Sequence, residues 1–206
     1  LFRSPGQSRY TTARNEGDEV EILSGIFEGQ TTGTPISMIV RNKDQRSRDY
    51  GNIAQTYRPG HADFGFDSKY GFRDYRGGGR SSGRETIGRV AAGAIAAKIL
   101  KELGITLQAY TRSIGPVSCH SYHPEVIKEN SFYMPDMVAA EKASQYLEQC
   151  MKEEDSAGGV IECRINGVPA GIGDPVFGKL DAAFAQALMS IGAVKAVGIG
   201  DGIKVS

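Results

Sequence analysis

The sequence predicts a fold that combines α-helices with β-strands, at least two of which are antiparallel. Apolar and polar residues alternate over 20–27, and a stretch of turn-forming residues separates this segment from a second apolar run at 35–40. Apolar residues then recur at helical spacing from Ile87 to Leu103, and further helix and strand patterns follow. Alternation with period 2 is typical of strands, whereas spacing of three to four residues is typical of helices.

The first of these patterns predicts a β-hairpin. Its strands cover 20–27 and 35–40, and the residues between them are rich in Gly and Thr, which favour a turn. The next region, 41–83, shows little periodicity but contains seven aromatic residues between Tyr50 and Tyr75. Because a long aperiodic stretch inside a domain is usually functional or disordered, we interpret this region as an ordered functional loop.

The strongest local signal is a helix start at Ser82. Ser82 and Glu85 have the spacing of a capping box, in which a hydroxyl and a carboxylate bond to the free N–H groups of the first turn. Apolar residues follow at helical spacing as far as Leu103, and Gly104 is typical of a helix end. We therefore predict a helix from Ser82 to Leu103.

The rest of the chain alternates between strand and helix patterns. We expect strands at 105–111, 159–165 and 193–199, helices at 136–151 and 179–191, and irregular connections at 116–135 and 167–178. No internal repeat and no clear break in composition divides the chain. We therefore expect residues 1–206 to form a single domain.

The overall composition excludes several classes of protein. The chain has 24 Lys and Arg and 24 Asp and Glu, which argues against a nucleic-acid-binding protein that relies on bulk charge. No apolar run approaches the length that a membrane span needs. The three cysteines are too few and too scattered for a disulfide framework, and no metal-ligand spacing joins them to the histidines. We expect a reduced, intracellular protein that binds no metal.

Arginine and glycine are concentrated in a way that points to an anionic ligand. Twelve of the 14 arginines lie in residues 1–89, and glycine accounts for 27 of the 206 residues. Residues 73–82 combine Arg, three consecutive Gly and two Ser directly before the predicted helix. A helix N-terminus attracts anions through its free N–H groups, and guanidinium groups suit phosphate or carboxylate. The alternatives are a solvated surface loop and an RNA-binding RGG tract.

A histidine in a tight turn is the main candidate for acid–base chemistry. His61 lies in the sequence RPGHAD, among aromatic residues, and imidazole can exchange a proton near neutral pH. A turn histidine that merely bonds to nearby backbone is the alternative. We expect His120 and His123 to be surface residues. Common nucleotide-binding patterns are absent, because the chain has no P-loop and its Gly clusters do not match GxGxxG.

Taken together, motifs spread over nearly the whole chain resemble the chorismate synthase family. GGGRSSGRET followed by RVAAGAIA is the most specific of them. The others are SRYTTAR (8–14), ILSGIFEGQTTGTPI (22–36), NKDQRSRDY (42–50), YRPGHADF (57–64), NGVPAGIGDPVF (166–177) and LDAAFAQALMSIGAVKAVGIGDG (180–202).

The resemblance implies a lyase reaction. In this family, 5-enolpyruvylshikimate 3-phosphate is converted to chorismate and phosphate by an anti 1,4-elimination, the last common step towards the aromatic amino acids. The reaction requires reduced FMN although it brings no net redox change. Either NADPH, used by the protein itself, or an external reductant would reduce the flavin.

The resemblance also assigns roles to individual residues. His61 corresponds to a catalytic histidine associated with protonating the reduced flavin or stabilising its charge. Two groups of positions correspond to flavin contacts, namely Arg80, Ser81 and Ser82 in one turn and Gly192 and Ala193 in another. Three arginines correspond to positions that bind the phosphorylated substrate or NADP: Arg3, Arg9 and Arg84.

The family fold is an α+β sandwich of antiparallel sheets with helices between them, and the implied assembly is a cytoplasmic homotetramer without nucleic-acid or membrane partners. The N-terminal GESHG motif of the family, which carries a second histidine, is absent, as is the C-terminal RHDP-type motif. We therefore expect these residues to be an interior portion of a longer chain. The alternative function is a non-catalytic fragment that binds flavin or an anion.

Overall fold

The computed structural model describes residues 8–11, 17–41, 52–76 and 78–205, without the side chains of residues 52, 80, 203 and 204. The chain divides into two compact units. The first unit comprises 1–20, 41–44 and 94–168, and the second comprises 21–40, 45–93 and 169–206. Among the described residues, no helix is both long enough and apolar enough to cross a membrane.

The first unit is built on a three-stranded antiparallel sheet. Its central strand β5 (Thr106–Ile114) pairs with β6 (Val117–Ser118) on one side and with β7 (Gly159–Asn166) on the other. β5 and β7 are paired over nearly their whole length, with one irregularity after Thr111. The strands predicted at 105–111 and 159–165 are therefore confirmed as antiparallel neighbours.

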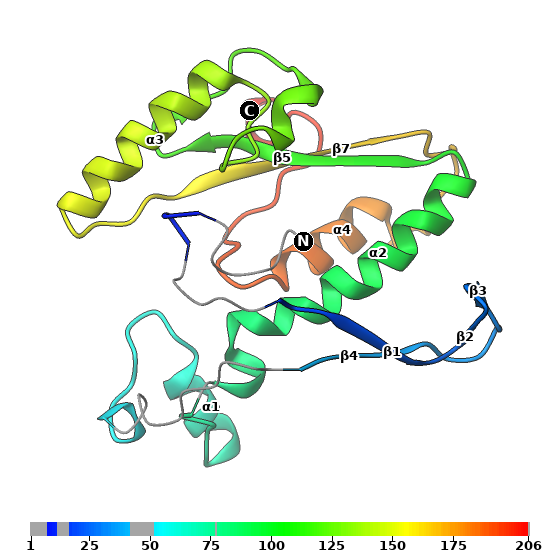
Figure 1. Ribbon diagram of the computed structural model, residues 1–206, viewed down its shortest axis with the longest axis horizontal. Coiled ribbons are helices and arrows are strands. Elements are labelled where there is room, and N and C mark those ends of the chain that lie inside the picture. The colour runs from blue at the N-terminus through cyan, green and yellow to red at the C-terminus, as the bar shows by residue number, and fades with distance from the viewer. Residues whose placement is uncertain (1–7, 12–16, 42–51, 77, 206) are drawn as a thin grey trace. The chain divides into compact units, whose positions relative to one another are not determined.

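A long amphipathic helix supplies the core of the first unit. Helix α3 (Met137–Lys152) runs alongside the sheet in Figure 1, and its N-terminus is capped by the Asp136 side chain, which accepts a hydrogen bond from the Ala139 N–H. A short 3₁₀ helix, η5 (Pro124–Lys128), precedes it. Small side chains on one face of α3 allow close packing. The buried cluster contains Cys119, Met134, Ala139, Ala140 and Ala143, with Ile114, Val117 and Phe132 packed against it.

The predicted hairpin and two further predicted helices are also present. Strand β1 (Val20–Ser24) pairs with β4 (Ser37–Val40), and between them β2 (Ile26–Phe27) pairs antiparallel with β3 (Gln30–Thr31). Helix α2 (Thr86–Glu102) follows two short 3₁₀ helices, η3 (Gly79–Ser81) and η4 (Gly83–Glu85), and α4 (Leu180–Met189) occupies the last predicted helix. The boundary between the two units falls within α2.

Two parts of the structure differ from the sequence prediction. The region 41–83 contains an α-helix, α1 (Asp63–Tyr70), and a short 3₁₀ helix, η2 (Asn52–Ala54). The strand predicted at 193–199 is wrong, because this segment has no regular structure and only the 3₁₀ helix η6 (Gly202–Val205) follows it. An extended segment becomes a strand only when another strand pairs with its backbone, and no described residue does so here.

Candidate active site

The RPGHAD sequence forms a tight turn that leads directly into α1. The His61 N–H donates to the Arg58 carbonyl at 3.2 Å, and α1 begins two residues later at Asp63. The His61 side chain is 23% exposed, so part of the side chain remains accessible. The turn thus presents a half-buried imidazole at the start of a helix.

A buried ion pair lies behind this histidine. The Asp63 side chain is only 3% exposed. The Arg58 guanidinium donates two hydrogen bonds to its carboxylate, with Nε 2.8 Å from Oδ2 and Nη2 2.9 Å from Oδ1. The Arg58 N–H donates to the same carboxylate at 3.1 Å. These hydrogen bonds lower the pKa of Asp63 well below its ordinary value, although burial acts in the opposite direction. Asp63 is therefore ionised at any neutral or mildly acidic pH.

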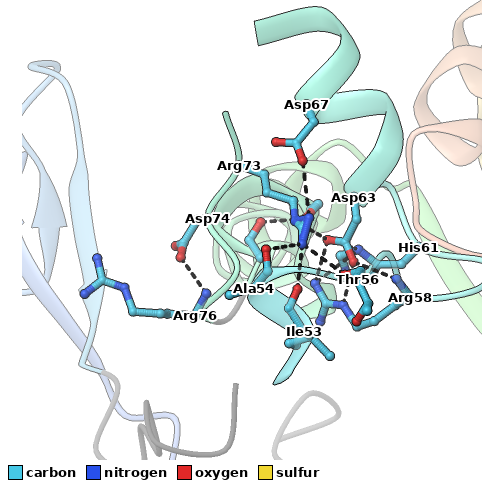
Figure 2. Close-up of polar contacts among 12 residues, drawn as sticks. Ile53, Ala54, Thr56, Arg58, His61, Asp63, Asp67, Arg73, Asp74 and Arg76 are labelled. Carbon is cyan, nitrogen blue, oxygen red and sulfur yellow. Dashed lines mark hydrogen bonds and ion pairs between the residues drawn. The ribbon is translucent and has the colours of Figure 1, made fainter. Parts of the chain in front are cut away.

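Figure 2 shows that His61 points towards this carboxylate. The His61 Nδ1 atom lies 3.0 Å from Asp63 Oδ1 and 3.2 Å from Arg58 Nη2. The other ring nitrogen, Nε2, has no hydrogen-bond partner among the described residues. One side of the imidazole is thus fixed by charged groups, and the other is available to a ligand.

Arg73 is the second arginine beside Asp63, with Nε 3.8 Å from Oδ1. Its side chain is 6% exposed, and its terminal nitrogens donate to the carbonyls of Ile53 (2.6 Å), Ala54 (3.1 Å) and Thr56 (3.0 Å) and to Asp67 (3.3 Å). Figure 2 shows this guanidinium at the centre of the cluster. The expectation of an anion-binding guanidinium is wrong for Arg73, because this side chain is buried and bonded to the chain's own backbone.

The glycine-rich turn lies against the histidine. Gly78 is buried in the left-handed conformation (φ +84°), and its carbonyl accepts hydrogen bonds from the Ser81 N–H (2.7 Å) and hydroxyl (2.6 Å). A Cβ atom on Gly78 would lie 2.9 Å from Ser81 Oγ, 3.4 Å from the Ser82 N and 3.5 Å from His61 Cε1. The structure therefore brings His61, Ser81 and Ser82 together around one glycine.

Ser82 connects this turn to the following helices. Its hydroxyl accepts a hydrogen bond from the Arg84 N–H at 3.3 Å, so Ser82 is a cap, but of the 3₁₀ helix η4. The reciprocal bond of the predicted capping box is not made, because the Ser82 N–H donates to the Gly79 carbonyl and the Glu85 carboxylate pairs with Arg89. Arg84 itself is half-buried. The backbone of Arg80 forms part of η3, while its side chain lies outside the described residues.

Gly192 and Ala193 lie in an exposed turn just after α4, where Ala193 has a positive φ of 70°. The end of α4 is bound to α2 through the Arg89 guanidinium, which donates to the Ser190 carbonyl and hydroxyl, each at 3.1 Å from Nη2. Gly192 and Ala193 are thus only two to three residues from a contact with the helix that follows Ser82.

Of the remaining predicted site residues, Arg9 belongs to the other compact unit and Arg3 lies outside the described residues. In that first unit, the Arg9 guanidinium pairs with Glu148 of α3 and donates to the Tyr10 hydroxyl at 2.6 Å. No group of three or more His, Cys, Asp or Glu side chains in the described parts of the chain could hold a metal ion.

Sequence reasoning missed the two residues that fix the histidine. In the sequence, Arg58 and Asp63 stand out only as parts of the YRPGHADF motif, although Asp63 follows His61 by two residues. Such spacing is common in turns and does not by itself bring the side chains together. The direction of the turn and the burial of the carboxylate create the contact, and both depend on the fold.

The chorismate synthase family model matches residues 2–206. The chain belongs to the chorismate synthase family. It is 66% identical over 202 residues to the chorismate synthase of Agathobacter rectalis, covering 97% of this chain and 55% of that protein. It is 58% identical over 202 residues to the chorismate synthase of Granulibacter bethesdensis, and this match covers 97% of this chain and 56% of that protein.

A crystal structure of a chorismate synthase has the same fold. It matches the chain with a TM-score of 0.75 at 32% identity, covering 91% of this chain and 57% of that one. This match confirms the predicted α+β fold class. The chain spans about half the length of the chorismate synthases it matches.

Proposed function

We propose that the protein to which these residues belong converts 5-enolpyruvylshikimate 3-phosphate to chorismate and phosphate, as a carbon–oxygen lyase. The reaction is an anti 1,4-elimination that requires reduced FMN without net redox change. The observation that carries the proposal is the half-buried His61 imidazole, held against the Gly78–Ser82 turn in a chain of this family. The product would serve aromatic amino-acid biosynthesis.

The residues around Gly78 fit a planar, polar ligand such as reduced FMN. A Cβ atom would crowd Ser81 Oγ at this position, so the bare backbone permits close approach. Two serines and the accessible part of the His61 side chain supply polar groups around the same point. When bound, reduced FMN would supply the electron density that assists the loss of phosphate.

We assign separate tasks to the chain's own residues. His61 would hold or transfer a proton at Nε2, next to the bound flavin. Two turns would bind the flavin, the first through Arg80, Ser81 and Ser82 and the second through Gly192 and Ala193. The contact between Arg89 and Ser190 favours this grouping, because it anchors the second turn to the helix α2, which follows the first turn.

The substrate carries a phosphate and carboxylates, which guanidinium groups bind well. Arg84 is the best supported of the three candidates, because it lies directly beside Ser82 at the start of the helices. Arg9 is paired with Glu148, so an anionic ligand would have to exchange with that carboxylate. Arg3 stays a candidate for the phosphorylated substrate or NADP on the resemblance alone.

The wider setting of the protein is also part of the proposal. We infer a cytoplasmic homotetramer whose flavin is reduced either by NADPH on the protein itself or by an external reductant. A second function applies to residues 1–206 alone, namely binding flavin or an anion without catalysis. This chain spans only 55–56% of the length of these relatives. For the isolated residues, that share favours binding without catalysis.

The deciding experiment is an anaerobic assay with 5-enolpyruvylshikimate 3-phosphate and chemically reduced FMN. It should be run on the 206-residue chain and on a chain of the full family length that contains it. We expect equal amounts of chorismate and phosphate from the longer chain. Failure of the longer chain to release either product, while it binds FMN, would contradict the lyase function and favour a binding protein.

A further inference from the structure

We propose that Asp63 is a positioning residue for His61, and that it holds the proton on Nδ1 and presents Nε2 as the ligand-facing atom. This inference rests on the proposed function, in which His61 acts on the bound flavin. It concerns the two residues whose contact the sequence did not indicate.

The charge state of Asp63 follows from the cations around it. The carboxylate accepts three hydrogen bonds from Arg58, two from the guanidinium and one from the backbone N–H. A second guanidinium, that of Arg73, approaches with Nε 3.8 Å from Oδ1. Two cations next to a carboxylate that is 3% exposed keep it ionised. Asp63 is therefore a permanent acceptor and does not itself exchange the proton.

The position of the imidazole proton follows from the charge on Asp63. An ionised oxygen, Asp63 Oδ1, lies 3.0 Å from His61 Nδ1. If Nδ1 carried a lone pair, that lone pair would face the anion, and the repulsion would be strong at a site shielded from water. With a proton on Nδ1, the same contact is a charge-assisted hydrogen bond. Arg58 Nη2 is 3.2 Å from Nδ1 and is already bonded to Oδ1.

The orientation of the His61 ring follows from its contact with Asp63. Asp63 fixes Nδ1, while Cε1, the atom between the two nitrogens, lies 3.5 Å from the point where a Cβ atom on Gly78 would stand. The contact at Nδ1 orients the ring, and Nε2 has no hydrogen-bond partner among the described residues. A neutral ring then accepts a proton at Nε2, and a protonated ring donates one from the same atom. The same nitrogen faces the ligand in both states.

A double-mutant cycle tests whether Asp63 acts through His61. Full-length proteins carrying Asp63→Asn, His61→Ala or both are compared in the anaerobic assay with reduced FMN. We expect His61→Ala to lower kcat by about 10²–10⁴-fold, the usual contribution of a proton-transferring group. Asp63→Asn should lower kcat at least about tenfold without changing KM or the FMN dissociation constant more than about twofold.

The double variant distinguishes positioning from folding. If Asp63 acts only through His61, the double variant has the same kcat as His61→Ala. A second drop of the same size on the His61→Ala background would overturn the inference, as would an unchanged kcat in Asp63→Asn. If His61→Ala itself keeps full turnover, the proposed role of His61 fails instead. The matched control is Asp155→Asn, an exposed carboxylate in the first unit whose side chain bonds to the neighbouring Ser156 N–H, and it should leave kcat unchanged.

A measurement on the unmodified side chain removes any dependence on the folding of Asp63→Asn. Full-length protein labelled with ¹⁵N-histidine is recorded by solid-state NMR at a pH where the ring is neutral, and His61 is assigned by its absence in His61→Ala. We expect a protonated Nδ1 and an unprotonated Nε2 for His61. The opposite tautomer would overturn the proposal, because Nδ1 would then accept from Arg58.

Discussion

The guanidinium of Arg89 in α2 donates hydrogen bonds to both the carbonyl and the hydroxyl of Ser190 at the end of α4, with Nη2 3.1 Å from each oxygen. The Arg89 Nε atom approaches the same hydroxyl at 3.3 Å. Glu85, one turn earlier in the chain, pairs with Arg89 and holds its side chain in place. This contact connects the two turns that we assign to flavin binding.

Arg89→Lys tests this connection. Lysine keeps the charge but lacks the planar group that reaches both Ser190 oxygens, so the turn at Gly192 loses its anchor. We expect FMN affinity to fall by about tenfold, equivalent to the loss of one or two hydrogen bonds. A fluorescence titration of FMN into the full-length protein measures this affinity. Lys98→Ala, an exposed cation on the same helix, is the control. Equal affinity losses in both variants would refute the connection.

Gly78→Ala tests the close contact between the glycine turn and His61. The new Cβ would lie 2.9 Å from Ser81 Oγ, and the left-handed backbone (φ +84°) adds a strain of about 1–2 kcal/mol. We expect weaker FMN binding and lower turnover in the full-length enzyme.

Gly71→Ala is the matched control for Gly78. Gly71 ends α1 with a similar φ of +76°, but a Cβ there would meet no atom within 4 Å. This variant should lose stability without losing FMN affinity. If both alanine variants bind FMN equally poorly, backbone strain rather than crowding at the site is responsible.

Arg80→Ala tests the flavin contact that the family resemblance assigns. A charge-assisted hydrogen bond contributes about 1.5–3 kcal/mol, so FMN binding should weaken by roughly 10- to 100-fold in the same titration. Arg76→Ala is the control, since Figure 2 shows the Arg76 side chain extending away from the cluster around Asp63. An unaltered titration curve for Arg80→Ala would remove this residue from the flavin site.

Asp136 should control acid stability in the first unit. Burial raises the pKa of this carboxyl, but N–H donors from Ala139, His120 and Ser121 outweigh it and lower the pKa below its ordinary value. A lowered pKa stabilises the fold above the unfolded value of about 4, and this stabilisation disappears as the pH falls below it.

We therefore expect Asp136→Ala to lower the free energy of unfolding at pH 7 by about 2–4 kcal/mol, with a smaller effect near pH 2. Chemical denaturation at both pH values measures the difference. Glu141→Gln, on the exposed face of the same helix, should have little effect at either pH. An equal loss at both pH values would show that the Asp136 charge is not responsible.

Much of the fold follows from local patterns. The capping serine at 82, the apolar spacing to Leu103 and the amphipathic run after Asp136 each predicted a helix that is present. α1 was missed because its sequence, DFGFDSKY, has a glycine and no apolar stripe. Its first residue is instead fixed by Arg58, and Asp67 is held by Arg73. Tertiary ion pairs supply what the local sequence lacks.

The sequence by itself determined the family, the helix that follows Ser82 and the choice of His61, because these depend on residue type and short-range spacing. Only the tertiary structure decided which charged groups are partners. Arg73, Arg76 and Arg80 look alike in the sequence, yet Arg73 is buried among backbone carbonyls. A guanidinium binds whichever acceptors the fold places within about 3 Å, and that distance is set by chain segments far apart in the sequence.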